Sequence, residues 1–536
     1  MKSSNKHPAN IVWLKPDNTL DQVFLHDLVE GKVWKTLNWF PLEEITIDKT
    51  KGAVVVVPGQ FWKVEQINEI IKPLEWVLLV IVCDEENLFE VNKLSHPNMK
   101  LWVQTPRAGK DYNATLFGVG YAFAARNREL KKKTNDVFLS AQDTHERRHS
   151  MFDMLSRYVQ MRSADGVSGV LNRTKGFTQG FSEKVYYDYM NMSKIAPAPS
   201  GTCSPDSFRL YEALEMGAIP VADDISPRYD SAGYWRSIFP DAPFPIVGRE
   251  EIAPVLDDLR EDFQHKANNV FAWWIRQKKK YVEKFYSDID ELMGRTREVA
   301  PDEVTAIVTV SPWKDNPDTE IFEECIESIR DTLGDIDIIV TFDGVREEQA
   351  YMRAKYEEFV HRALYLCNKD GAILPIVFDK HVHQVGAVRE ALKEVQTNLI
   401  LFVEGDTALR VRTEEVFEIL PRIGKEYDLI RFYHFDEIPS EHQYLMKKQT
   451  KIPGGSLVNT IQWSQRPHLS TKRFYDKIMG YFSDNANCFI EDKMHGVAQT
   501  PKFDGKMAIY LSDGGATSIH LDGRKGLEKY DERQVF

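Results

Sequence analysis

The chain has 536 residues, enough for about three or four domains of ordinary size, and its net charge is −13. This acidic balance disfavours a general nucleic-acid binder, although a local basic groove stays compatible with one. The five cysteines are scattered without a CxxC pair, which argues against a zinc site or a disulfide framework. The first residues form no apolar signal core and the apolar runs are too short for a membrane span, so we expect a soluble, cytoplasmic protein.

Short apolar runs alternate with helix-like segments in the first part of the chain. Strands are predicted at 11–14, 52–59 and 76–83, with a helix over 62–71 between the last two. Such alternation is typical of βαβ units, and hence of a parallel sheet covered by helices. A further helix is predicted from about 118 to 133.

A second series of strands and helices starts at 136–140 and indicates a second Rossmann-like lobe, with a cleft between the two lobes. Its most informative segment is 200–221, where a loop of small residues opens a helix whose free N–H groups can face a phosphate. Arg209 lies one turn inside this helix and adds positive charge, and Glu212 can accept a hydrogen bond from a sugar hydroxyl. The alternative is a capped helix that only packs on its sheet.

The residues Asp206-Ser207-Phe208-Arg209, Glu212-Ala213-Leu214 and Gly217-Ala218-Ile219-Pro220-Val221 resemble the donor-site signature of exostosin-type glycosyltransferases. The resemblance covers about 130–260 well and the N-terminal part weakly. It implies a two-lobed GT-B fold, with an acceptor-side lobe at 1–130 and a donor-side lobe at 131–300, that uses nucleotide sugars without a metal. It implies donor contacts from Arg209 and Glu212 and, more loosely, diphosphate contacts from Arg147, Arg148 and Lys194. By position alone, the cleft-edge candidates for a base are Asp84, Glu85 and His145.

A long helix is predicted over 262–295, and the polar, proline-containing segment 297–302 marks the predicted domain boundary. The second half, 304–536, opens with a β-branched strand at 304–310. A second strand, at 336–342, ends in Asp343-Gly344. Strand, loop, helix and strand in this order again indicate a βαβ unit with an acid at its carboxyl edge.

A third strand, at 399–403, is wholly apolar, as expected for a central strand buried on both faces, and it stops at Glu404-Gly405-Asp406. Open α/β sheets bind ligands at such a carboxyl edge, where oxygen ligands suit Mg²⁺ or Mn²⁺ carrying a diphosphate. An ordinary acidic turn is the alternative interpretation.

The order of these elements resembles that of metal-dependent GT-A glycosyltransferases. The resemblance implies that Pro312, in the loop after the first strand, and Asp343 hold the nucleoside. It also implies that Glu404 contacts the ribose and that Asp406 binds the metal. Glutamate here replaces the first aspartate of the usual DxD element.

Two later features extend this resemblance. The segment 489–495 resembles the Glu-Asp pair that begins an acceptor-side helix in inverting enzymes, so Asp492, or its neighbour Glu491, is predicted to deprotonate the acceptor hydroxyl. His520 is predicted to complete the metal shell, and Arg524 or Lys525 to close over the diphosphate. The alternatives are a helix-capping carboxylate and a surface histidine.

The sequence thus predicts an α/β protein in which two Rossmann-like lobes (GT-B) precede a Rossmann-like GT-A domain. The predicted enzyme is bifunctional: both modules transfer sugars from a nucleotide-sugar donor, such as a UDP-sugar, to a glycan, with Mn²⁺ or Mg²⁺ in the GT-A module. Three alternatives stay open: catalysis by the GT-A module alone with the first half as an acceptor-binding scaffold, a phage-type transferase acting on modified DNA bases, and a nucleotidyltransferase. The oligomeric state is left open.

Overall fold

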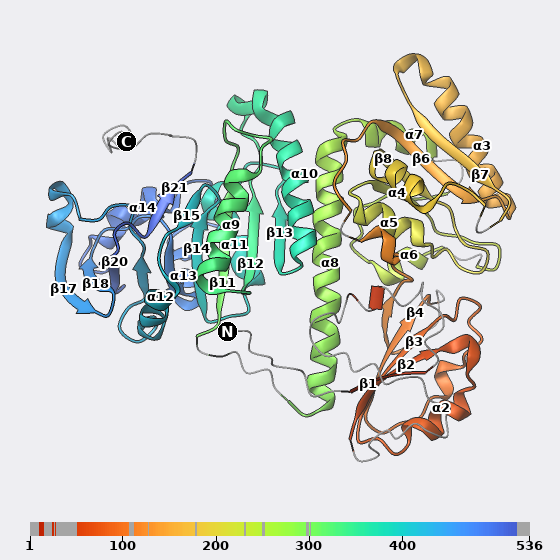
Figure 1. Cartoon of the computed structure of the whole chain (residues 1–536), viewed down its shortest axis with the longest axis horizontal. Coiled ribbons are helices and arrows are strands. Elements are labelled where there is room, and N and C mark those ends of the chain that lie inside the picture. Colours follow the sequence, from red (N-terminus) through yellow and green to blue (C-terminus); the bar gives the residue numbers. More distant parts are fainter. Residues whose placement is uncertain are drawn as a thin grey trace. The chain divides into compact units, whose positions relative to one another are not determined.

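The computed structural model describes residues 10–14, 24–25, 27, 51–106, 112–126, 128–176, 179–229, 232–248, 252–295, 300 and 302–521. The chain divides into two compact units, Met1–Arg297 and Glu298–Phe536 (Figure 1). The first unit contains two five-stranded sheets and the second a nine-stranded sheet, each with parallel Rossmann-like strands. The predicted α/β fold class is therefore confirmed.

The first lobe of the first unit is a parallel sheet in the order β1-β2-β3-β4-β5. Every residue of β2 (Ala53–Pro58) and β3 (Val77–Val82) is buried, which explains why their apolar runs do not alternate. α2 (Val64–Ile71) connects them and buries its apolar stripe. The other strands are β1 (Asn10–Trp13), β4 (Met99–Gln104) and β5 (Thr115–Phe117).

The helix predicted over 118–133 is wrong: in the described part of that stretch only one short 3₁₀ turn forms, η4 (Phe123–Ala125). The reason is tertiary contact with the second lobe. The Val119 N–H donates to Asp206 Oδ2 at 3.0 Å, and a Cβ added at Gly118 would lie 1.5 Å from the Tyr211 hydroxyl oxygen. Packing against the second lobe thus overrides the local helical pattern.

The second lobe is a parallel sheet in the order β10-β9-β8-β6-β7. The strand order reverses between β6 (Asn135–Gln142) and β8 (Ser193–Ala198), so the switch point where open sheets bind ligands lies at their carboxyl ends. The other strands are β7 (Gly169–Thr174), β9 (Ile219–Asp223) and β10 (Ile246–Val247), and the helices are α3 (Glu146–Met161), α4 (Glu183–Asn191), α5 (Phe208–Glu215), α6 (Tyr234–Ile238) and α7 (Ile252–Arg260).

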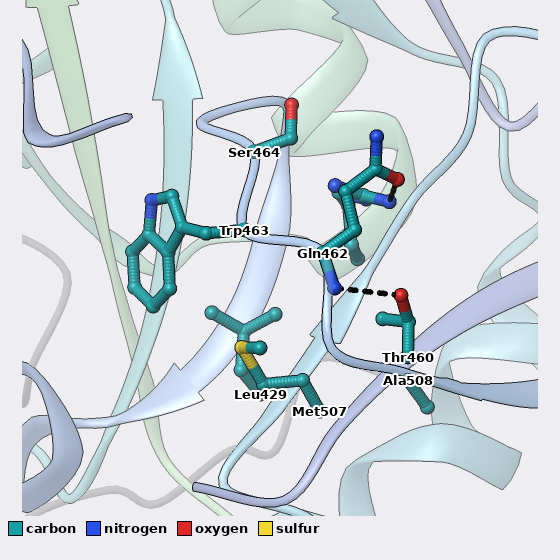
Figure 2. A pocket seen from close by; sticks show the side chains of 8 residues that line it. Leu429, Thr460, Gln462, Trp463, Ser464, Met507 and Ala508 are labelled. Carbon is teal, nitrogen blue, oxygen red and sulfur yellow. Dashed lines mark hydrogen bonds between the residues drawn. The ribbon is translucent and has the colours of Figure 1, made fainter. Parts of the chain in front are cut away.

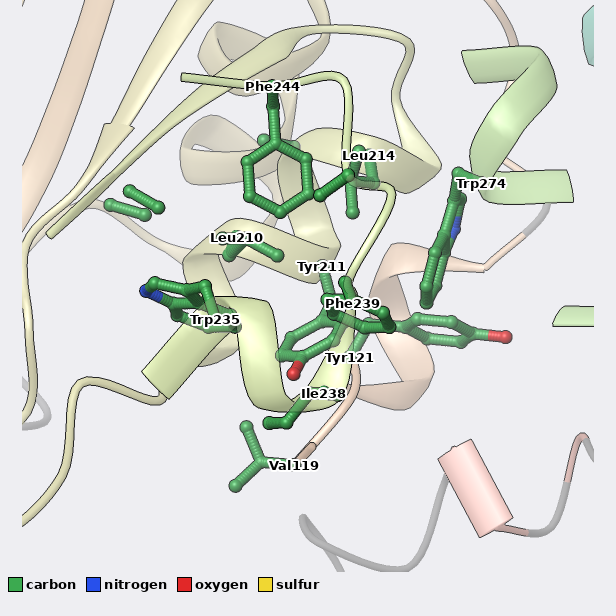
Figure 3. Close-up of a cluster of buried hydrophobic side chains, with 14 of the residues drawn as sticks. Val119, Tyr121, Leu210, Tyr211, Leu214, Trp235, Ile238, Phe239, Phe244 and Trp274 are labelled. Carbon is green, nitrogen blue, oxygen red and sulfur yellow. The ribbon is translucent and has the colours of Figure 1, made fainter. Parts of the chain in front are cut away.

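The long helix α8 (Phe263–Leu292) joins the two lobes of the first unit. In its first half the Trp274 indole N–H donates to Glu215 of α5 at 2.6 Å, and near its end Asp288 accepts from the Trp102 indole of β4 at 2.9 Å. Aromatic side chains pack beside the helix, among them Tyr211 and Trp274 with 5.8 Å between ring centroids, and Figure 3 shows part of this cluster. The two lobes therefore share one continuous hydrophobic core.

The second unit is built on a mixed sheet in the order β13-β12-β11-β14-β19-β16-β20-β18-β17. The strands β11, β12, β13 and β14 are mutually parallel, so their carboxyl ends form one edge, with a switch point between β11 and β14. The strands are β11 (Val304–Val310), β12 (Asp337–Phe342), β13 (Ile373–Val377), β14 (Leu399–Glu404), β16 (Leu429–Arg431), β17 (Met446–Ile452), β18 (Gly455–Thr460), β19 (His468–Thr471) and β20 (Met507–Ser512).

Helices cover this sheet, and a separate two-stranded sheet lies at its carboxyl edge. α11, α13 and α14 share a hydrophobic core with β11 and β14. The small sheet pairs β15 (Thr407–Leu409) with β21 (Ser518–His520). The helices are α9 (Glu320–Leu333), α10 (Arg353–Asp370), α11 (His383–Glu394), α12 (Thr413–Ile419), α13 (Lys472–Met479) and α14 (Ile490–Ala498). No helix in the described ranges has both the length and the apolar character that crossing a membrane requires.

Candidate functional site

The turn after β14 runs directly against β11. The Gly405 N–H donates to the Thr309 carbonyl at 2.8 Å, and a Cβ at Gly405 would lie 2.7 Å from a Val310 methyl carbon. Glycine is therefore the residue that lets the backbone pass this close. The turn sets Glu404 at the end of one strand and Asp406 just before the next.

Asp406 and His520 are 114 positions apart in sequence, and the structure brings them together. β15 and β21 are antiparallel, with Thr407 opposite His520. The Leu521 N–H donates to the Asp406 carbonyl at 2.6 Å, and Thr407 Oγ1 lies 3.2 Å from His520 Nδ1. The backbones of the two predicted metal ligands thus lie side by side at one end of the small sheet, whereas Arg524 lies outside the described residues.

His434, which sequence reasoning missed, supports this small sheet. Its Nδ1 lies 2.6 Å from Ser518 Oγ, and its ring packs edge-on to His520 with 4.5 Å between ring centroids. Burial, followed by the charge of Arg466, lowers the pKa of His434 to about 2, so the ring is neutral. Nothing local in the sequence marks this histidine, because only the pairing of β21 with the segment after β16 reveals it.

Glu404 connects the strand end to the start of α14. Burial, and then the nearby charges of Asp406 and Glu491, raise the pKa of Glu404 to about 8. The Gln384 side chain of α11 donates to Glu404 at 3.2 Å and accepts the Ile490 N–H at 3.1 Å. Gln384, also missed from sequence, therefore ties the acid at the end of β14 to the first turn of α14.

The predicted Glu-Asp pair occupies that first turn. Glu491 accepts the Gln465 N–H at 3.1 Å, which fixes one of its carboxylate oxygens. Asp492 is exposed, and its charge acts on the neighbouring His383. Glu491 is therefore a structural anchor in this arrangement, and Asp492 is the carboxylate that solvent or a substrate can reach.

Asp343, at the end of β12, is buried and surrounded by donors from its own chain. It accepts N–H groups from Val382 at 2.7 Å, Gly344 at 2.8 Å and His383 at 3.1 Å. His381 Nδ1 lies 2.7 Å from Asp343 Oδ2, and burial raises the pKa of Asp343. Pro312 is half-buried in the loop after β11.

The two candidate metal ligands, Asp406 and His520, offer one carboxylate and one imidazole to an ion. In the described part of the chain, no three His, Cys, Asp or Glu side chains gather into a metal site of their own. Asp406 Oδ1 and His520 Nδ1 instead lie on either side of Thr407 Oγ1, at 3.3 and 3.2 Å from it. Such a pair fits Mg²⁺ or Mn²⁺ held on a nucleotide, because those ions take their remaining ligands from phosphate oxygens and water.

In the first unit, the switch point of the second lobe gathers several predicted residues. Arg147 pairs with Asp223 of β9 through two N–H donors. The Arg209 Nε–H donates to the Ser140 carbonyl of β6 at 2.8 Å. His145 Nε2 lies 3.3 Å from the Ser200 carbonyl, and burial lowers its pKa.

Arg148, next to Arg147, is buried at the same edge of the second lobe. It donates to the Ser200 and Gln142 carbonyls. Burial, and then the charge of Arg209, lower its pKa to about 10. Two guanidinium groups therefore lie close together at this edge.

The two other predicted donor residues, Glu212 and Lys194, have partners within the chain. Both carboxylate oxygens of the buried Glu212 accept hydroxyl donors, from Tyr186 at 2.7 Å and Tyr187 at 2.8 Å, and burial raises its pKa. Lys194 lies at the amino end of β8 and pairs with Asp136 at 2.8 Å, on the opposite edge of the sheet from Arg147. A strand run of six residues separates the two edges, so Lys194 and Arg147 do not converge.

In the first lobe, Asp84 shapes the turn after β3 by accepting N–H groups from Leu88 and Phe89. Glu85, beside it, is exposed.

A recess in the second unit lies apart from these residues. It is enclosed by β16, β18, β20 and the loop after β18, and a hydrogen bond from the Gln462 N–H to Thr460 closes one side (Figure 2). None of the predicted site residues lines it. The lining residues are Leu429, Arg431, Thr460, Gln462, Trp463, Ser464, Met507 and Ala508.

No family model and no curated protein matches this chain. Several solved structures do, each over about two fifths of it. HddC from Yersinia pseudotuberculosis, complexed with GMP-PN, is 14% identical over 41% of this chain and 93% of its own length, with a TM-score of 0.27. S. aureus TarS 1-349 with UDP-GlcNAc is 12% identical over 40% of this chain and 57% of its own, with a TM-score of 0.28. GalNAc-T7 with UDP, GalNAc and Mn²⁺ is 9% identical over 40% of this chain and 43% of its own, with a TM-score of 0.27. At such values the likeness by itself assigns no activity to this chain.

Proposed function

We propose that the second unit is a metal-dependent GT-A glycosyltransferase domain that transfers a sugar from a nucleotide-sugar donor to a hydroxyl of a glycan. One observation carries the proposal: Asp406 and His520 meet through the β15–β21 pair, beside the strand end that Gln384 links to α14. An ion ligand pair and a carboxylate-bearing helix at one sheet edge are the two parts that this chemistry needs.

The roles follow from the environment of each side chain. Asp406 and His520 would hold Mn²⁺ or Mg²⁺, which supplies positive charge for the departing diphosphate. Asp492 takes the proton of the acceptor hydroxyl while that oxygen bonds to the anomeric carbon. The bond from that carbon to the diphosphate breaks, and its electron pair leaves with the nucleotide. Glu491 holds the first turn of α14 in place through the Gln465 N–H.

For the first unit we propose the role of an acceptor-binding scaffold. The support is that both carboxylate oxygens of Glu212 accept tyrosine hydroxyls within the chain and that Lys194 lies at the other edge of its sheet. A second transferase site remains the competing proposal, because Arg148 and Arg209 place positive charge there.

The test is donor turnover by the full chain. Nucleotide sugars are supplied with Mn²⁺ and a panel of acceptors, including glycans and DNA with modified bases, and the released nucleoside diphosphate is measured. Asp406→Asn is expected to abolish release, whereas Asp504→Asn, which alters an exposed carboxylate paired with Lys477, is expected to retain it. Arg209→Ala is expected to leave release unchanged. Normal turnover by Asp406→Asn contradicts the proposal, and loss in Arg209→Ala favours a second transferase site.

A further inference from the structure

Two histidines hold an arginine at the carboxyl ends of β12 and β13, and the proposed function does not use it. Arg346 follows β12, whereas His381 and His383 follow β13. The Arg346 Nε–H donates to His381 Nε2 at 3.2 Å, and a terminal nitrogen of the same guanidinium lies 3.2 Å from His383 Nε2. A guanidinium carries five N–H donors, so these two contacts engage only part of its donor set.

The same cluster engages the Asp343 carboxylate. His381 Nε2 accepts from Arg346, and Nδ1 of the same ring lies 2.7 Å from Asp343 Oδ2. With three backbone N–H donors on the same carboxylate, Asp343 locks the loop before α11 onto the end of β12. The fit is tight, since a Cβ at Gly344 would lie 2.3 Å from the Lys380 carbonyl carbon. Asp343 therefore orients Arg346 through His381.

Charge and backbone geometry mark the cluster as a built arrangement. Burial, and then the charge of Arg346, lower the pKa of His383 to about 4, so the ring is neutral and Arg346 carries the positive charge. His383 has φ +58°, a sparsely populated conformation that persists where neighbours determine it. Its ring packs edge-on to Phe489, with 4.1 Å between ring centroids, just before the helix that carries Asp492.

The position of Arg346 corresponds to the base end of a nucleotide bound at this edge. β11 lies between β14 and β12, so two strand spacings, about 10 Å, separate the end of β14 from the end of β12. A nucleotide with its diphosphate at Asp406 and His520 therefore extends along the edge towards β12. Its base then reaches the loop that carries Arg346.

We propose that Arg346 contacts the base of the donor nucleotide, and that the donor is a guanosine diphosphate sugar. The inference rests on the proposed function and deepens it. Uracil presents an N3–H donor between its two carbonyls, and reading it needs an acceptor, but the buried Asp343 carboxylate already accepts three backbone N–H groups and lies against His381. Guanine presents O6 and N7, two adjacent acceptors that a guanidinium fork meets with two parallel hydrogen bonds.

The experiment measures the affinity of the full chain for GDP, UDP, CDP and ADP by calorimetric titration with Mn²⁺. GDP is expected to bind about 5- to 150-fold more tightly than UDP, the range for a bidentate arginine–guanine pair. Arg346→Lys keeps the charge but loses the fork, so the GDP:UDP affinity ratio is expected to fall close to 1. Arg422→Ala removes an arginine that pairs with Glu426 at 3.0 Å ahead of β16, and is expected to keep the wild-type ratio.

The outcomes separate this inference from the proposed function. If UDP binds most tightly, or if Arg346→Lys keeps the wild-type ratio, the inference is overturned while nucleotide binding stands. If none of the four nucleotides binds with Mn²⁺, both are overturned. The wild-type ranking needs no variant, so it decides the matter even if Arg346→Lys fails to fold.

Discussion

Gly405→Ala tests the geometry of the turn that positions the candidate ion ligand. The added Cβ would lie 2.7 Å from a Val310 methyl carbon and 3.3 Å from the Thr309 carbonyl oxygen, both on the buried strand β11. A contact under 3 Å forces either β11 or the turn to move, and overpacking of this kind costs about 1–3 kcal/mol. The glycine has no positive φ, so strain from backbone conformation adds nothing.

The two expected effects of Gly405→Ala are measured separately. Urea unfolding should show a loss of about 1–3 kcal/mol, although a Gly→Ala change without a clash typically stabilises by about 0.4–1 kcal/mol. Nucleotide-sugar turnover should fall by about 100-fold, because a shift near 1 Å in a reacting constellation has that effect. Gly496→Ala, in α14 with open space around it, is the control and should stabilise. A Gly405→Ala protein as stable and active as wild type refutes the reasoning.

Three further predictions follow from single side chains. Asp492→Asn should lower turnover by about 10²- to 10⁴-fold with donor affinity unchanged, and turnover within 2-fold of wild type would exclude Asp492 as the base. For Glu404, whose pKa is raised to about 8, the native state holds a proton that the unfolded state loses, so stability should fall as pH rises from about 4.5 to 8. Glu404→Gln should flatten that fall in urea unfolding at pH 5 and pH 8, and an unchanged slope contradicts the assignment. Tyr187→Phe removes a hydroxyl donor from buried Glu212 and should lower the free energy of unfolding by about 1–3 kcal/mol in thermal or urea unfolding. Nucleotide affinity should stay unchanged, and a changed affinity would show that Glu212 contacts the donor.

The sequence predicts the strands well because the central strands are buried on both faces. Runs such as 399–403 and 76–83 are continuous and apolar, and that property depends on local composition. The segment 118–133 shows the limit of this reasoning. Its helical pattern is genuine, but its conformation depends on Asp206 and Tyr211, nearly a hundred residues later in the chain.

The residues of the candidate site also differ in whether a local sequence pattern predicts them. Asp406 and Asp492 follow from local patterns, a strand end and a helix start. Gln384 and His434 give no local signal, because each acts by joining segments that only the folded sheet places side by side. Glu212 differs from these residues. Its spacing on α5 predicts a ligand contact, but its carboxylate accepts hydroxyl donors from Tyr186 and Tyr187, which belong to a different helix.

The central claim is that Asp406 and His520 hold one divalent ion against a nucleoside diphosphate. Titration of the full chain with Mn²⁺ in the presence of GDP or UDP, followed by the electron paramagnetic resonance signal of free Mn²⁺, measures it directly. We expect one nucleotide-dependent Mn²⁺ site per chain in wild type, and its loss in both Asp406→Asn and His520→Ala. Unaltered Mn²⁺ binding in both variants, or no nucleotide-dependent site in wild type, would contradict it.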